Sequence, residues 1–150
     1  MKFGLFTHIP WPEEKDPKQV LDETTEEIVY AEELGFHSAW VAEHHFSRYG
    51  LGSSSLVFSA SVAAQTKKIR LGTAILIPPL HHPIKLAEDA ATLDLVSGGR
   101  FDAGFGRGTA GYEYAGYNID QGETQARFQE TINMVKGLWT TPGFSYKGKY

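Results

Sequence analysis

The stretch IRLGTAILIPPLHHPIKLAEDAATLDLVSGGRFDAGFGRG, residues 69–108, predicts a strand, a helix and a second strand in succession. Residues 69–77 form a nearly continuous apolar run that two prolines end, which is typical of a buried strand. Residues 83–95 carry apolar side chains at three- and four-residue steps, behind a proline that suits the first helical turn. Two glycines close this pattern, and residues 101–105 begin the next apolar run. The stretch therefore predicts a β-α-β unit with parallel strands.

The rest of the chain repeats the same order of elements. Further strands are predicted over residues 2–9 and 37–42, and further helices over residues 17–34, 56–65 and 123–139. Strand and helix thus alternate four times, which indicates an α/β fold with a parallel sheet. Two architectures fit this order: an open doubly wound sheet, and part of a (β/α)8 barrel of the TIM-barrel type. In both, the chemistry takes place at the carboxyl ends of the strands.

The composition predicts a single domain, residues 1–150, with a substantial hydrophobic core. Of the 150 residues, 41% are hydrophobic and 21% are charged. The formal net charge is −4, and lysine and arginine are outnumbered, which argues against a nucleic-acid partner. The chain has no cysteine, which excludes disulfides and thiol chemistry. We find neither a signal peptide nor an apolar run near the ~20 residues that span a bilayer, and we expect a cytoplasmic protein without a membrane partner.

The sequence WVAEHHF, residues 40–46, leads a predicted buried strand directly into three titratable side chains. Glu43, His44 and His45 follow that strand, so they lie on the predicted functional edge. His8 ends the first strand and lies on the same edge. Histidine titrates near neutral pH and suits proton transfer. Because neighbouring side chains of an extended segment point to opposite faces, one histidine of the pair can face the site while the other packs elsewhere. A purely structural role for both is the alternative.

A metal site is another interpretation of these side chains. Glu43 and the histidines at positions 8, 44, 45, 81 and 82 offer the nitrogen and oxygen ligands that metal-dependent barrel hydrolases use. Adjacent histidines rarely bind one ion together, and the chain has no HExxH motif. The sequence therefore predicts no metal, with the hydrolase kept as an alternative.

Two further segments end strands at the same edge. Gly106, Arg107 and Gly108 follow the fourth strand, where glycines let backbone N–H groups approach an anion and a guanidinium matches phosphate geometry. A glycine-rich turn with a surface arginine is the simpler interpretation. Residues 73–75 are small or apolar near the end of the third strand, and they leave room for a flat ligand unless they only fill the core.

The opposite edge of the sheet carries ordinary connecting turns. Asp94 and Arg100 lie on either side of the turn at residues 97–99. We expect these two side chains to form an ion pair that stabilises the turn.

Together these segments resemble the luciferase-like, flavin-dependent monooxygenase family. The matching stretches are MKFGLF, EELGFHSAWVAEHHF, the segment from IRLGTAILI to LVSGGR, and FDAGFGRG, in the same order and with similar spacing. The family fold is an eight-stranded α/β barrel, which needs about 300 residues. The resemblance therefore implies that this chain carries the first four β/α units, the N-terminal half of a barrel. We expect it to be a fragment of a longer chain.

The resemblance also implies a cofactor, partners and residue roles. Reduced FMN, delivered by a separate flavin reductase, is expected to bind at the carboxyl edge and to react with O2 to oxidise a small organic substrate. His44 matches the histidine that assists catalysis, and we expect Glu43 to orient it. Arg107 matches the residue that holds the flavin phosphate, with Gly106 and Gly108 allowing close approach of the backbone.

The remaining roles implied by the resemblance concern the third strand and two histidines. Thr73, Ala74 and Ile75 match the strand that lies against the flavin ring, where family members can carry a non-proline cis peptide bond. His8 and His45 are candidates for substrate contact. We also expect a homodimer or a heterodimer.

Three other functions stay open. A related branch of the superfamily uses a reduced deazaflavin, although its members usually lack the EHHF run of residues 43–46. A metal-dependent barrel hydrolase and a non-catalytic half-barrel interaction module are the other two. True luciferases carry a reactive cysteine where this chain has Gly106, so we expect oxygenation without light emission.

Overall fold

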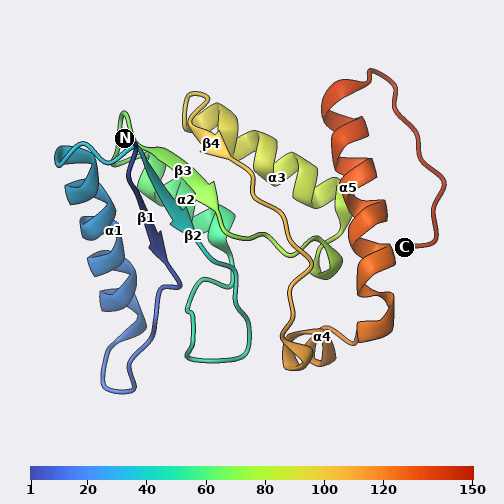
Figure 1. Cartoon of the computed structure of the whole chain (residues 1–150), viewed down its shortest axis with the longest axis horizontal. Coiled ribbons are helices and arrows are strands. Elements are labelled where there is room, and N and C mark those ends of the chain that lie inside the picture. Colours follow the sequence, from blue (N-terminus) through green and yellow to red (C-terminus); the bar gives the residue numbers. More distant parts are fainter.

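The computed structural model describes residues 1–150 and contains four β/α units (Figure 1). The strands are β1 (Gly4–Thr7), β2 (Ser38–Val41), β3 (Arg70–Thr73) and β4 (Phe101–Asp102). The helices are α1 (Pro17–Glu33), α2 (Ser55–Ala63), α3 (Pro83–Val96), α4 (Gly111–Gly116) and α5 (Thr124–Thr140), with 3-10 turns η1 (Pro78–Leu80) and η2 (Gln121–Glu123). None of these helices combines the length and the apolar character that a membrane span requires.

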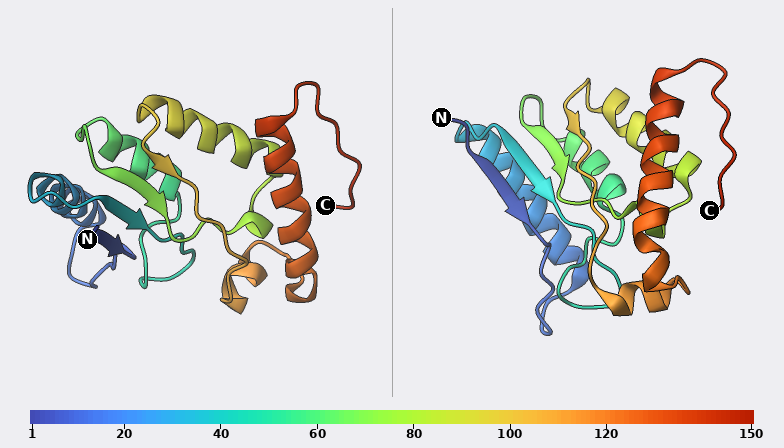
Figure 2. Two further views of the ribbon diagram at one scale, coloured as in Figure 1. Left: turned by 45° about the horizontal axis from the view of Figure 1, so that its top comes forward. Right: turned by 45° about the vertical axis from the view of Figure 1, so that its right-hand side comes forward.

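The four strands form one parallel sheet in the order of the chain, β1-β2-β3-β4. In this register Leu5 lies beside Ala39, Ala39 beside Leu71, and Leu71 beside Phe101. Successive helices contact one another, α1 with α2, α2 with α3, and α3 with α5, so they cover one face of the sheet (Figure 2). A doubly wound sheet would reverse its strand order and carry helices on both faces. The structure therefore has the architecture of part of a barrel, and the doubly wound alternative is wrong.

The hydrophobic core lies between the sheet and these helices. The inner face predicted for residues 83–95 is wrong in part, because its members Ile84 and Leu95 are exposed. Ile28 of α1 and Leu86 and Leu93 of α3 are fully buried. They belong to one cluster with Val41 and Leu71 from the strands. This packing holds the sheet rigid and directs the carboxyl ends of the strands to one side.

The carboxyl half of the third predicted strand is irregular. Regular pairing stops at Thr73, and it resumes only as a single bridge between Leu76 and Phe105. Residues 106–116, predicted as a glycine-rich loop, contain the short helix α4. Tyr114 of this helix is buried against Ile77 and Leu80, and this burial outweighs the low helix propensity of the glycines.

The predicted ion pair between Asp94 and Arg100 is wrong. The guanidinium of Arg100 instead donates five hydrogen bonds of 2.7–3.2 Å to oxygens of Ala63, Thr66, Ile69 and Ser97. A guanidinium has five donors in one rigid plane, so it can satisfy several carbonyl groups at once. Arg100 thereby ties the ends of α2 and α3 to the start of β3, at the edge opposite the functional one.

Candidate functional site

A cavity of about 250 Å³ lies at the carboxyl ends of the strands. Its walls come from the ends of β1, β2 and β3 and from the segment between β4 and α4. Six predicted site residues line it: His8, Glu43, His44, Ala74, Ile75 and Gly108. The sheet thus brings together side chains from distant parts of the chain, as parallel strands that end side by side must do.

His44 has a hydrogen-bond partner at each ring nitrogen. Its Nδ1 atom lies 3.2 Å from the Oε1 atom of Glu113, and its Nε2 atom lies 3.3 Å from the Nδ1 atom of His8. Glu113 is buried in α4, and the same oxygen accepts the backbone N–H of His45 at 2.9 Å. Because a carboxylate is an acceptor only, Glu113 fixes the orientation of the His44 ring.

His8 lies between His44 and Tyr49. The Nε2 atom of His8 is 3.3 Å from the hydroxyl of Tyr49. Partial burial and the neighbouring His44 ring lower the pKa of His8 below its ordinary value of 6.5, since both disfavour its charged form. A side chain at Gly50 would meet the carbonyl oxygen of His8 at 2.5 Å, so glycine is required where this loop approaches β1.

The expectation that Glu43 orients His44 is wrong. Its carboxylate accepts hydrogen bonds from the rings of His45 at 2.9 Å and His81 at 2.7 Å, and from the backbone N–H of Ile77 at 3.0 Å. The reason is the alternation of an extended segment, which places Glu43 and His45 on one side and His44 on the other. Burial by itself would raise the pKa of Glu43, but these three donors lower it to about 2.

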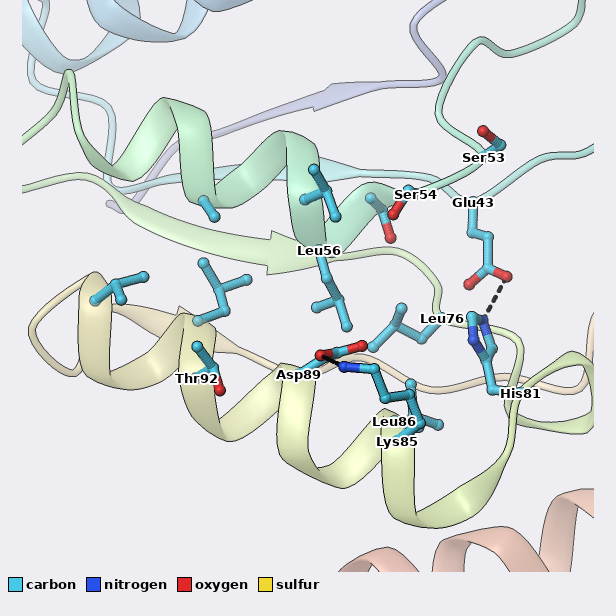
Figure 3. Close-up of a pocket in the computed structure, with 15 residues that line it drawn as sticks. Glu43, Ser53, Ser54, Leu56, Leu76, His81, Lys85, Leu86, Asp89 and Thr92 are labelled. Atoms are coloured by element: carbon cyan, nitrogen blue, oxygen red, sulfur yellow. Dashed lines mark hydrogen bonds and ion pairs between the residues drawn. The ribbon is translucent and has the colours of Figure 1, made fainter.

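Figure 3 shows Glu43 pointing toward His81 at one end of a groove between α2 and α3. The groove has a volume of about 480 Å³, and Lys85 and Asp89 pair along its α3 side. Glu43 borders both this groove and the cavity. Its carboxylate therefore separates the outer surface of the helices from the inner site.

Four of the ten predicted site residues do not line the cavity: His45, Thr73, Gly106 and Arg107. His45 is buried, and its ring nitrogens contact Glu43 and the hydroxyl of Tyr117. Thr73 is also fully buried, and its hydroxyl bonds to both the N–H and the carbonyl oxygen of Gly104. Both side chains hold neighbouring segments in position.

The segment of Gly106, Arg107 and Gly108 passes beside the cavity. Arg107 is exposed, and none of the ion pairs of the chain involves its guanidinium. Gly108 has a φ of +75°, which disfavours any side chain, and it lines the cavity directly. Gly108 is the one residue of this segment that lines the cavity, and the exposed Arg107 precedes it directly in the chain. Bare backbone beside an unpaired guanidinium suits a phosphate group.

Ala74 and Ile75 form the wall of the cavity at the end of β3. The peptide bond between them is cis, as the family resemblance implies for this position. The Ile75 side chain packs directly against Gly106, where a β-carbon would collide with its Cδ1 atom. The missing side chain at Gly106 thus leaves room for the Ile75 side chain at the cavity wall.

No three histidine, aspartate or glutamate side chains converge in a way that could hold a metal ion. The histidines divide instead into two hydrogen-bonded groups, each with its own carboxylate. His8 and His44 group with Glu113, whereas His45 and His81 group with Glu43.

Sequence reasoning missed Glu113 and Tyr49. Both lie in segments that the sequence predicts as loops, and the spacing along the chain does not relate either residue to His44. The one available signal was Glu113 itself, a lone carboxylate between the aromatic residues of the run GYEYAG.

Comparisons with known proteins identify the family of the chain. The family described as luciferase-like monooxygenase matches residues 1–150. The chain is 36% identical over 142 residues to the flavin-dependent trigonelline monooxygenase, oxygenase component, of Acinetobacter baylyi, covering 93% of this chain and 39% of that protein. It is 33% identical over 139 residues to the alkanal monooxygenase alpha chain of the Kryptophanaron alfredi symbiont, a match that covers 92% of this chain and 39% of that protein.

Among solved structures, the monooxygenase RslO1 of Streptomyces bottropensis superposes with a TM-score of 0.96 at 37% identity. The match covers all of this chain and 46% of that one. The chain thus spans about two fifths of the length of the curated relatives it matches. Its four β/α units correspond to roughly the first half of their barrel. On these grounds, the chain belongs to the luciferase-like monooxygenase family.

Proposed function

We propose that the protein is an FMN-dependent monooxygenase that uses reduced flavin and O2 to oxidise a small organic substrate. One observation carries this proposal: the cavity at the carboxyl edge combines the His44–Glu113 pair, the wall of Ala74 and Ile75, and Gly108 beside a free Arg107. A proton-transfer group, a flat wall and a phosphate site are what a reduced flavin mononucleotide requires.

Several residues of the chain have the chemistry that reduced FMN needs. Arg107 and the bare backbone at Gly108 would hold the phosphate through charge-assisted hydrogen bonds. Ile75, packed against Gly106 at the cavity wall, would contact the ring. When bound, reduced FMN supplies the two electrons that reduce O2, so that one oxygen atom enters the substrate and the other leaves as water.

His44 would handle the proton that this chemistry requires. Its imidazole can accept a proton on Nε2, and the imidazolium so formed faces the buried carboxylate of Glu113 at 3.2 Å. The apolar walls from Ala42, Ile75 and Ile77 limit the access of water to the same space.

Two partners belong to this proposal. The reduced flavin would come from a separate reductase, in line with the name "oxygenase component" of the trigonelline monooxygenase relative. The second partner is another copy of the chain, packed on the face of α2 and α3. Val57 and Val96 line the groove there and are 70% and 61% exposed, so they form an apolar surface. Lys85 and Asp89 on the same face could each form an ion pair with the opposite residue of a copy related by a two-fold axis.

Sedimentation measurements test the dimer. Val57→Asp should shift the protein from dimer to monomer. Leu34→Asp, at an equally exposed apolar residue near the end of α1, should leave it dimeric. A wild-type protein that sediments as a monomer at micromolar concentration contradicts the dimer but not the enzyme.

Anaerobic titration with reduced FMN, followed by mixing with oxygenated buffer, tests the function. We expect saturable binding and reoxidation kinetics that differ from those of free reduced FMN. His44→Ala should still bind reduced FMN, and its reoxidation rate should differ from that of the wild type by at least tenfold. Loss of a proton-transfer group typically slows turnover by about 100-fold or more. His82→Ala removes an exposed histidine outside the cavity and is the matched control. Absent binding, or tighter binding of a reduced deazaflavin, would contradict the proposal.

A further inference from the structure

Four side chains form a continuous hydrogen-bonded row from the surface into the cavity. Tyr49 contacts His8 at 3.3 Å, His8 contacts His44 at 3.3 Å, and His44 contacts Glu113 at 3.2 Å. The four residues come from the end of β1, the segment after β2, and α4. The row begins at Tyr49, which is 57% exposed, and ends at Glu113, which is 2% exposed.

The chemistry of the groups gives this row a direction. Glu113 can only accept, so the Nδ1 atom of His44 carries the proton and its Nε2 atom is an acceptor. His8 must therefore donate through Nδ1, which leaves its own Nε2 atom to accept from the hydroxyl of Tyr49. Every contact then has one donor and one acceptor, with both histidines neutral.

We propose that His8 and Tyr49 form a proton relay that connects His44 to solvent. This inference rests on the proposed role of His44 in proton transfer. It assigns His8 to the relay in place of the substrate contact that the sequence suggested.

Each step moves one proton and leaves no charge unaccounted for. The hydroxyl of Tyr49 gives its proton to the Nε2 atom of His8 and takes another from solvent. His8, now protonated on both nitrogens, passes the Nδ1 proton to the Nε2 atom of His44. His44 becomes an imidazolium beside the Glu113 carboxylate, and His8 is again neutral. His8 then carries its proton on Nε2, and the reverse sequence returns the Nε2 proton of His44 to solvent.

The surroundings favour this role for His8. A relay histidine must be neutral at rest, and the pKa of His8 is lowered by burial and by His44. The groups that face it are Tyr49, His44 and the edge of Phe6. On its other side His8 borders a hollow shared with Lys15, Glu23 and Glu27, and Lys15 pairs with Glu23 there. The His44 ring is faced by His8, Tyr49 and Glu113.

The protonation pattern can be measured without any flavin. Long-range ¹⁵N–¹H correlation spectra of the histidine rings should show the proton on Nδ1 in both His8 and His44. Tyr49→Phe should shift the Nε2 signal of His8, because it removes the hydroxyl while keeping the ring. Proton occupancy on Nε2 of His8, or an Nε2 signal unchanged in Tyr49→Phe, would overturn the relay whatever the protein catalyses.

The rate of reoxidation of bound reduced FMN tests the function of the relay. His8→Asn is the decisive variant, because its amide can still donate to His44 but cannot pass a proton on. We expect His8→Asn and Tyr49→Phe to change the rate at least threefold, less than His44→Ala, and to enlarge the solvent isotope effect. In His8→Gly, which removes the whole ring, added imidazole should restore the reoxidation rate by taking the place of the His8 side chain.

The outcomes separate the relay from the proposed function. If His8→Asn reacts at the wild-type rate with an unchanged isotope effect, His8 only positions His44 and the relay is wrong. If reduced FMN does not bind, the proposed function fails, whereas the spectra still decide whether the proton row exists.

Discussion

The Nδ1 atom of His44 lies 3.2 Å from the Oε1 atom of Glu113, 69 residues further along the chain. The same oxygen accepts the backbone N–H of His45. One buried carboxylate from α4 thus holds the histidine pair that follows β2. Its removal should affect both stability and chemistry.

Glu113→Gln should lower the free energy of unfolding by about 1–3 kcal/mol, because a neutral amide replaces the charged acceptor of two donors. It should also slow reoxidation of bound reduced FMN, since an imidazolium at His44 loses its counter-charge. Urea unfolding measures the first effect, with Glu26→Gln on the exposed face of α1 as the control. Equal stability of the two variants would contradict the role of Glu113.

The contribution of Glu43 to the free energy of unfolding should depend on pH in acid solution. The pKa of Glu43 is lowered from 4.5 to about 2 in the folded protein, so its carboxylate binds protons more weakly there than in the unfolded chain. The contribution, about 3 kcal/mol, is fully present above pH 4.5 and is lost as the pH falls toward 2.

Glu43→Gln tests this dependence. Its deficit in unfolding free energy relative to wild type should be constant between pH 7 and 5 and should shrink as the pH falls from about 4.5 to 2. Urea titrations across this range measure it. A deficit that does not change with pH would mean that the donors around Glu43 do not favour its charged form.

Gly104 and Gly106 should respond differently to alanine. At Gly106 the new methyl group meets the Cδ1 atom of Ile75, whereas at Gly104 it meets the backbone carbonyl oxygen of Thr73. We expect Gly106→Ala to cost about 1–3 kcal/mol of stability and Gly104→Ala to cost more, since a strand carbonyl cannot turn aside.

A double-mutant cycle separates the two cases. Ile75→Val removes the Cδ1 atom, so it should relieve the strain of Gly106→Ala but not that of Gly104→Ala. Urea unfolding of the single and double variants provides the measurement. Strictly additive effects at positions 75 and 106 would show that these side chains do not collide.

Arg107→Ala should weaken the binding of reduced FMN about tenfold or more, and leave that of reduced riboflavin nearly unchanged. Only FMN carries the phosphate that a guanidinium binds through charge-assisted hydrogen bonds. Anaerobic titrations give both affinities, with Lys67→Ala at the opposite edge of the sheet as the control for net charge. An equal loss for both flavins would mean that Arg107 contacts the ring or the protein instead.

Arg100→Lys should lower the free energy of unfolding by about 2 kcal/mol without affecting flavin affinity. A lysine has three donors on a flexible stem and cannot reproduce the five hydrogen bonds of the planar guanidinium. Thermal or urea unfolding measures the loss. A loss of flavin affinity together with the loss of stability would indicate that the structure at this edge affects the geometry of the site.

Much of the fold follows from local patterns. The proline at residue 83 and the glycines after residue 97 placed α3 almost to the residue, because they mark where a helix can begin and end. The face that α3 buries, with Leu86 and Leu93, differs from the predicted one, because only packing on the sheet selects it. The helix α4 could not be predicted in this way. Its glycines disfavour a helix, and only the burial of Tyr114 against residues from another segment stabilises it.

The sequence alone determined the alternation of four strands and helices, the family, and the edge on which His44, Arg107 and the residues after β3 gather. These features depend on periodicity and on residues close together in the chain. Only the tertiary structure decided that Glu43 bonds to His45 and His81, and that His44 bonds to His8 and Glu113. The physical reason is that a hydrogen bond requires two side chains to meet in space, and these partners are brought together only when the sheet and α4 close around the cavity.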